Sequence, residues 1–111
     1  MIDYRLELSK VLSILAQPWQ EQVRYLECHR VDADELALEF DDLFCVADAK
    51  REAGELSEKE HKALHRLDHM LDRMSGSENA HLWTNEALKN RPEWEDVRRL
   101  ARDVLIEMHA Q

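Results

Sequence analysis

The sequence predicts an all-α protein, a compact bundle of five to six helices that forms one domain over residues 1–111. Glycine and proline occur only twice each, whereas an all-β chain of this length needs many more turn residues. Hydrophobic residues make up 44% of the chain and charged residues 35%, a balance typical of helices that bury one face and leave the other in water. A length of 111 residues fits a single domain near the low end of the usual size range.

Two helices are predicted in the first 30 residues. The first covers about residues 4–16, where apolar residues recur on one helical stripe, formed by Tyr4, Leu8, Val11, Leu12 and Leu15. Pro18 ends this helix and suits the first turn of the next one, because that position needs no N–H group. The second helix then runs to about Cys28, with apolar side chains at Trp19, Val23 and Leu26.

A long third helix is predicted between an acidic cap and a glycine. Asp32 or Asp34 can cap its first turn, and it is expected to continue to Ala53 because Gly54 is the first strong stop signal after it. Its expected core stripe consists of Leu36, Phe40, Leu43, Phe44 and Ala47.

The second half of the chain is expected to hold two long helices joined by a short one. Ser57 followed by Glu60 is a capping box, which starts a fourth helix that ends near Gly76. Residues 77–90 are predicted to contain a short helix, and Pro92 opens the last one with an acidic first turn that suits the helix dipole. The expected buried residues are Leu64, Leu67, Leu71, Met74, Leu82, Trp83, Leu88, Trp94, Val97, Ala101, Val104, Leu105 and Met108.

The sequence also predicts a soluble protein of the cytoplasm with no membrane attachment. No stretch approaches the roughly 20 apolar residues of a membrane span, and the first residues lack the apolar core of a signal peptide. Cys28 and Cys45 are the only cysteines, and each falls within a predicted helix. This usage argues for reduced thiols rather than for a scaffold held by disulfides.

The negative charge is concentrated in one segment, and this is the most informative feature of the composition. Residues 32–60 hold eleven acids and three bases, a net charge of -8, whereas residues 1–31 are neutral and residues 61–111 carry -1. An acidic surface repels phosphate, so direct nucleic-acid binding is not expected, whereas a basic protein is a suitable partner. The last helix carries a small basic cluster that we expect to pair with neighbouring carboxylates, formed by Arg98, Arg99 and Arg102.

The acids of the third helix form two stripes beside its core face, Glu35, Glu39 and Asp42 in one and Asp34, Asp41, Asp48 and Glu52 in the other. Leu38 and Cys45 fall between the stripes, and an apolar centre with a charged rim is typical of a protein interface. The alternative is a central helix that packs on two sides and buries Leu38 and Cys45. The predicted partner-binding residues are Glu35, Leu38, Glu39, Asp41, Asp42, Cys45 and Asp48.

The histidines of the fourth helix are the main candidates for chemistry. His61 and His65 are four residues apart and share a helix face with Asp68 and Asp72, so the two rings can bind one metal ion. However, Lys62 stands where the zincin pattern needs glutamate, and the sequence shows no further ligand. We therefore expect surface imidazoles paired with aspartates and predict no bound metal, no cofactor and no enzymatic activity. A metal-binding enzyme or sensor that uses His61 and His65 is the alternative.

Two runs of the first half of the chain resemble known bacterial proteins, PWQEQVRYL at residues 18–26 and DELALEFDD at residues 34–42. They look like small bacterial proteins of about this length and are similar to immunity proteins of toxin systems, including contact-dependent growth inhibition. This resemblance implies a cytoplasmic protein that binds and neutralises one cognate toxin. With the acidic surface it predicts a basic toxin, for example a nuclease. The alternative is a helical adaptor or a homo-oligomer that has no toxin partner.

Overall fold

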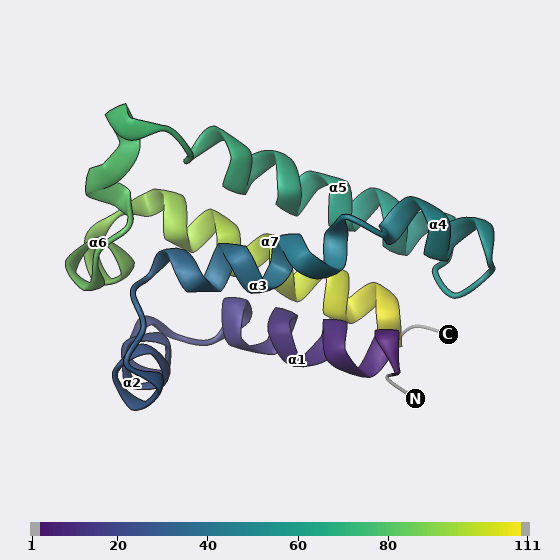
Figure 1. Cartoon of the computed structure of the whole chain (residues 1–111), viewed down its shortest axis with the longest axis horizontal. Helices are drawn as coiled ribbons and strands as arrows, with labels where there is room; N and C mark the ends of the chain where they lie inside the picture. Colours follow the sequence, from purple (N-terminus) through teal and green to yellow (C-terminus); the bar gives the residue numbers. More distant parts are fainter. Residues whose placement is uncertain (1–2, 110–111) are drawn as a thin grey trace.

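The computed structural model describes residues 3–109. Four long helices pack around one hydrophobic core, and each runs antiparallel to its neighbours (Figure 1). They are α1 (Tyr4–Ala16), α3 (Asp34–Phe44), α5 (Glu58–Arg73) and α7 (Pro92–His109). This is the up-and-down arrangement of a four-helix bundle.

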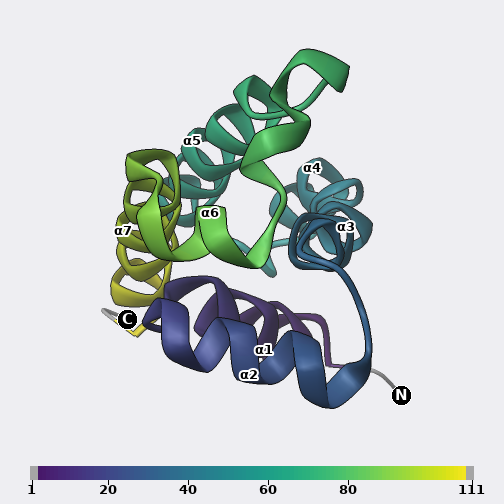
Figure 2. The same ribbon diagram turned by 90° about the vertical axis from the view of Figure 1, so that its left-hand side faces the viewer.

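The other helices connect these four and lie at the two ends of the bundle. They are α2 (Trp19–His29), α4 (Ala47–Glu52), the 3₁₀ helix η1 (Ser77–Leu82) and α6 (Asn85–Asn90). Figure 2 shows α2 and α6 crossing one end of the bundle, and α4 lies at the other end in Figure 1. Within residues 3–109 no helix is long and apolar enough to cross a membrane. The element order of residues 3–109 confirms the predicted all-helical bundle.

The described residues form seven α-helices and one 3₁₀ helix, more than the predicted five to six, because two of the predicted helices are each divided. The expected short helix over residues 77–90 is split at Trp83. Thr84 restarts it, since its side chain accepts a hydrogen bond of 3.0 Å from the amide of Ala87 and so caps α6.

The second division corrects the third predicted helix, which ends at Phe44 instead of continuing to Ala53. Val46 leaves helical geometry with φ −108° and ψ 9°, and α4 begins at the following residue. The resulting turn places Ala47 in the core, with 1% of its surface exposed. The predicted cap is also wrong, because Ala33 precedes the helix and no side chain caps it.

Side chains cap the first turns of α1 and α5 by hydrogen bonding to backbone amides. The side chain of Asp3 accepts a hydrogen bond from the amide of Leu6 and so caps α1. The predicted capping box of α5 is confirmed: the Ser57 amide donates to Glu60 Oε1 at 2.8 Å, and the Glu60 amide donates to Ser57 Oγ at 3.1 Å. Both contacts satisfy amide groups that have no partner inside the helix.

The end of the bundle beneath α2 and α6 is held by a buried guanidinium group. Arg98 is 2% exposed, and its Nε and Nη2 donate to Gln22 Oε1 at 3.0 and 2.9 Å. Its remaining donors bind the carbonyl of Leu88 and Glu95 Oε1. The Gln22 amide group in turn donates to the carbonyls of Ile14 and Leu15. One network therefore joins four helices, α1, α2, α6 and α7.

This network refines the expectation for the basic cluster of the last helix. Arg98 and Arg99 do pair with carboxylates of the same helix, at Glu95 and Asp96. Arg98 nevertheless lies inside the protein. The physical reason is that Gln22 and a helix-end carbonyl supply the acceptors that a buried guanidinium requires.

We predict that Gln22→Leu lowers the free energy of unfolding by about 3 kcal/mol, because it leaves the buried charge of Arg98 without its central acceptor. Urea denaturation followed by circular dichroism measures this loss. Gln20→Leu is the matched control, since Gln20 is exposed on the same helix and its replacement should change stability by no more than about 0.5 kcal/mol. Equal effects of the two substitutions would contradict the role given to the network.

Candidate functional site

Leu38 stands out as an apolar side chain on the outer side of α3. It is 52% exposed, whereas Leu36 and Phe40 of the same helix are 1% exposed and face the core. Cys45 is exposed as well. The helix does pack on two sides, against α1 and α5, yet it does not bury this pair. The alternative of a central helix that buries Leu38 and Cys45 is therefore wrong.

Carboxylates from two helices surround Leu38. Two adjoining open grooves share Ala37, Leu38 and Ser75, one between α3 and α5 and the other reaching η1. The carboxylates that line them are Asp32, Asp34, Asp41, Asp68 and Asp72. We call Leu38 with these five aspartates the acidic face. The sequence pointed to the aspartates of α3, but only the packing of α3 on α5 shows that Asp68 and Asp72 join them.

The charges of the acidic face repel one another. Burial, and next the neighbouring carboxylates of Asp72 and Asp41, raise the pKa of Asp68, an effect that nearby histidines only partly offset. The ion pairs formed within residues 3–109 involve other carboxylates. None of the five aspartates of this face therefore forms an ion pair with the described part of the chain.

The stripe predicted from Glu35, Glu39 and Asp42 lies on the side of α3 toward α1 and α2. Glu39 and Asp42 line a groove together with Lys10 and Tyr25. The hydroxyl of Tyr25 donates to Glu39 Oε1 at 2.8 Å, and burial, followed by this hydrogen bond, raises the pKa of Tyr25 to about 12. Glu39 is therefore partly engaged inside the protein, whereas the carboxylate of Asp42 is exposed.

Beyond the turn at Val46 four of the five acids have partners, which divides the charged segment predicted over residues 32–60. These contacts are Glu55 with Lys50 at 3.2 Å, Glu58 with Arg51 at 3.7 Å, Glu60 with Arg5 at 2.8 Å and Asp48 with His61 at 2.6 Å. Asp48 had been grouped with the stripe of Asp34 and Asp41. The turn removes it from that stripe and brings it against α5.

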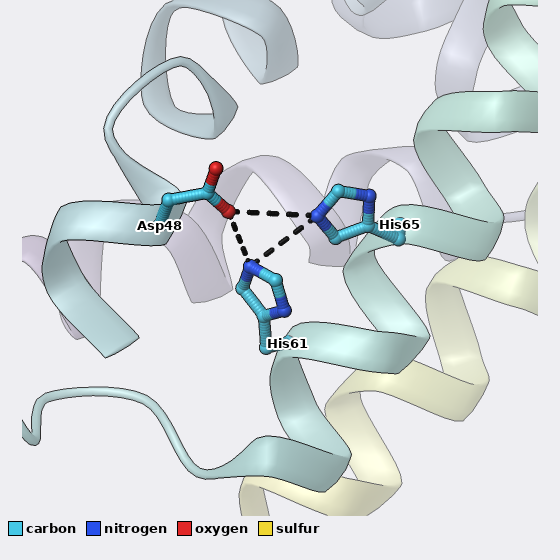
Figure 3. Close-up of side chains that lie close together, drawn as sticks. All are labelled: Asp48, His61 and His65. Carbon is cyan, nitrogen blue, oxygen red and sulfur yellow. Dashed lines mark hydrogen bonds and ion pairs between the residues drawn. The ribbon is translucent and has the colours of Figure 1, made fainter. Parts of the chain in front are cut away.

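Asp48 forms a compact cluster with two histidines of α5 (Figure 3). His61 Nε2 lies 2.6 Å from Asp48 Oδ1, His65 Nε2 lies 3.3 Å from His61 Nε2, and His65 Nε2 lies 3.6 Å from Asp48 Oδ1. Three potential ligand atoms thus point toward one another. Sequence reasoning named both histidines but missed the aspartate, which lies 13 residues before His61 on another helix.

The three members of this cluster differ in exposure. The side chain of His61 is 8% exposed, while those of His65 and Asp48 are 51% and 74% exposed. The expectation of surface imidazoles paired with aspartates therefore holds only in part, because His61 is buried. The hydrogen bond from His61 lowers the pKa of Asp48, which keeps this carboxylate ionised at neutral pH.

A buried ion pair fixes the first turn of α5 next to His61. Arg5 donates to both carboxylate oxygens of Glu60, at 2.9 and 2.8 Å. Burial raises the pKa of Glu60, but the hydrogen bonds from Arg5 and Ser57 outweigh it and leave the pKa below its ordinary value of 4.5. The carboxylate is thus held charged inside the protein, and it anchors the end of α5 that carries His61.

We predict that Arg5→Ala lowers the free energy of unfolding by about 3 kcal/mol at neutral pH, because it leaves the Glu60 carboxylate buried without its cation. The pKa of Glu60 is lowered in the folded state, so the ion pair contributes fully above the ordinary value. Its contribution is lost as the pH falls through the lowered value. Denaturation curves at neutral and acidic pH should therefore show the difference from the unaltered protein shrinking toward acid.

Arg24→Ala provides the matched control, since the bridge of Arg24 to Glu21 is largely exposed and should contribute little. A loss of stability in Arg5→Ala that stays the same at every pH would contradict the assignment. So would a loss no larger than that of Arg24→Ala.

Comparison with protein-family models, with curated proteins and with solved structures finds no match to this chain. The acidic face and the Asp48–His61–His65 cluster therefore have to be interpreted from their own geometry and charge.

Proposed function

We propose that this chain is a binding protein that docks a basic protein on its acidic face and thereby neutralises a cognate bacterial toxin. The observation that carries the proposal is the set of five carboxylates around the exposed Leu38, none of which takes part in an ion pair within residues 3–109. An apolar centre with a charged rim is how many protein interfaces are built.

The electrostatics favour a cationic partner over other ligands. The charged form of Asp68 is held at a cost, because burial, and next the carboxylates of Asp72 and Asp41, raise its pKa in the folded protein. Lysine and arginine side chains of a partner would relieve this repulsion and would speed the encounter at low salt. Nucleic acid would increase the repulsion, because its phosphates carry the same sign of charge as the face.

Two of the residues predicted from the sequence, Leu38 and Asp41, belong to the acidic face. Glu35, Glu39 and Asp42 lie on the side of α3 toward α1 and α2, where Glu39 binds Tyr25. These three acids and the exposed Cys45 remain proposed contacts outside the acidic face. Asp48 is removed from the set, because its carboxylate is bound to His61.

The toxin part of the proposal rests on the resemblance of residues 18–26 and 34–42 to immunity proteins. A toxin that acts on nucleic acid has a basic surface for its substrate. A face of closely spaced carboxylates would occupy that surface in place of phosphates and so block access to it. Such a partner would meet this chain in the cytoplasm.

We predict that the triple reversal Asp34→Lys, Asp41→Lys and Asp72→Lys weakens this binding strongly, because it replaces three exposed carboxylates of the acidic face by cations. The partner is first identified by cross-linking in the cells that produce the protein, and is then purified. Surface plasmon resonance at several salt concentrations measures the rates, and we expect association to slow by at least about tenfold. The circular dichroism spectrum should remain that of the unaltered protein.

A second triple reversal with the same change in net charge serves as the control: Glu27→Lys, Glu86→Lys and Glu107→Lys, on α2, α6 and α7. It should leave binding close to that of the unaltered protein. Equal loss in both triple variants, or a partner that is not basic, would overturn the docking face. A basic partner that has no toxic activity, or whose activity survives binding, would overturn the toxin assignment and favour a helical adaptor.

We predict that Asp68→Asn stabilises the fold while it weakens partner binding. Removing one of two like charges four residues apart on α5 should raise the free energy of unfolding by roughly 0.2–0.5 kcal/mol. The raised pKa of Asp68 agrees, because it shows that the charged carboxylate is less favourable in the folded protein than in the unfolded chain. Urea denaturation and the binding assay measure the two effects. Loss of stability in this variant would show that Asp68 has a structural partner instead of a role in docking.

A further inference from the structure

We propose that Asp48, His61 and His65 form a binding site for one divalent transition-metal ion of the zinc type. The inference is independent of the docking face, because it rests on other side chains at the end of the bundle where α4 lies. Figure 3 shows the carboxylate of Asp48 and the rings of both histidines directed toward a common point.

The distances between the three atoms are close to those of a tetrahedral metal site. Bonds of about 2.0–2.1 Å from zinc to nitrogen or oxygen place neighbouring ligand atoms roughly 3.3–3.4 Å apart. Two sides of the triangle are 3.3 and 3.6 Å, so His65 needs little movement. The third side, from His61 to Asp48, is a hydrogen bond of 2.6 Å that would open by less than about 1 Å.

The arrangement of protons also favours a cation in the triangle. His61 Nε2 carries its hydrogen toward Asp48 Oδ1, since a carboxylate at 2.6 Å can only accept. His65 Nε2 lies 3.3 Å from the same nitrogen and 3.6 Å from Asp48 Oδ1, to the side of this hydrogen bond. A metal ion that replaces this hydrogen accepts a lone pair from each of the three atoms.

Helix α5 holds the two histidines in place. His61 and His65 lie one turn apart on α5, the usual spacing of two histidines that share an ion. The ring of His65 packs edge-on against Phe44 at 5.0 Å, and His61 is buried. Asp48 comes from α4 and is exposed, so solvent reaches the site. With three protein ligands, a fourth position remains for water or for a donor from a partner.

The donor set selects the kind of metal. Two imidazole nitrogens and one carboxylate oxygen suit zinc and its neighbours in the transition series, whereas magnesium and calcium prefer oxygen ligands throughout. Nickel and copper bind the same donors with at least comparable affinity. Among these ions we take zinc for the test, because three protein ligands and one open position are typical of zinc sites. Cobalt is its spectroscopic substitute.

Arg51 is the group that opposes the ion. Its Nη1 lies 3.5 Å from His61 Nδ1, which therefore accepts a hydrogen bond while Nε2 carries the hydrogen. Metal binding at Nε2 places the hydrogen on Nδ1, so the guanidinium has to turn away, and Glu58 Oε1 at 3.7 Å is an available acceptor. Arg51→Gln removes the cation and offers an oxygen to Nδ1, and it should bind zinc more tightly than the unaltered protein.

The test uses the whole chain, purified without a histidine tag and freed of metal with a chelator. Isothermal titration calorimetry with zinc should show one ion bound per chain. Thermal denaturation should show that zinc raises the midpoint of unfolding by several degrees. Titration with cobalt should give the intense visible absorption of a four-coordinate ion. Asp48→Asn and His65→Gln should each weaken zinc binding at least about tenfold, because a lost ligand costs no less than a lost outer-shell partner.

His61→Gln is not used, because replacing a buried ring can unfold the protein, whereas Asp48 and His65 are exposed. His69→Gln and His81→Gln are the matched controls on exposed histidines and should leave affinity unchanged. Absence of zinc binding would overturn the proposal, as would unchanged affinity in Asp48→Asn. A loss in His69→Gln equal to that in His65→Gln would place the ion on a different pair of α5 and would also overturn it.

Discussion

The turn between α3 and α4 is the constraint on which both candidate sites depend. A continuous helix to Ala53 would have carried Asp48 along the stripe of Asp34 and Asp41. Because the backbone leaves helical geometry at Val46, Asp48 reaches His61 instead. The acids before the turn stay without cations, and those after it mostly find partners. One local change in direction thus separates a charged docking surface from a ligand cluster.

The two sites have different physical characters. The acidic face gathers like charges around an apolar side chain, an arrangement that raises the free energy of the isolated protein and is relieved by a cationic surface. The Asp48–His61–His65 cluster brings three potential ligand atoms together, an arrangement that one metal ion can bridge. The apolar core is built mainly from the stripes of α1, α3, α5 and α7, and His61 is buried beside it.

The sequence predicted the features that depend on residues close to one another along the chain. The bounds of α1 and α7 follow from an apolar stripe, a proline and an acidic first turn, and the capping box of α5 is a contact between residues three apart. The turn at Val46 has no glycine or proline to mark it. It is a consequence of packing, and local propensities of this size are easily overridden by tertiary contacts.

The candidate sites were predicted only where their members share a helix. His61 and His65 were recognised from their spacing, and so were the acids of α3 around Leu38. Asp48 was assigned to the wrong surface because its position depends on the turn. Asp68 and Asp72 had been noted on one face of α5, yet their proximity to Asp41 depends on how two helices pack. The pairing of Gln22 with Arg98 spans 76 residues and has no local signal.

The two ends of the bundle are held with unequal firmness. At one end the guanidinium of Arg98 joins four helices through hydrogen bonds that water does not reach. At the other end α4 has only six residues, packs mainly on α5 and exposes three of its six residues. Short helices of this kind open at low cost. Backbone amides of α4 should accordingly exchange with solvent through local fraying, while those beneath α2 exchange only when the whole molecule unfolds.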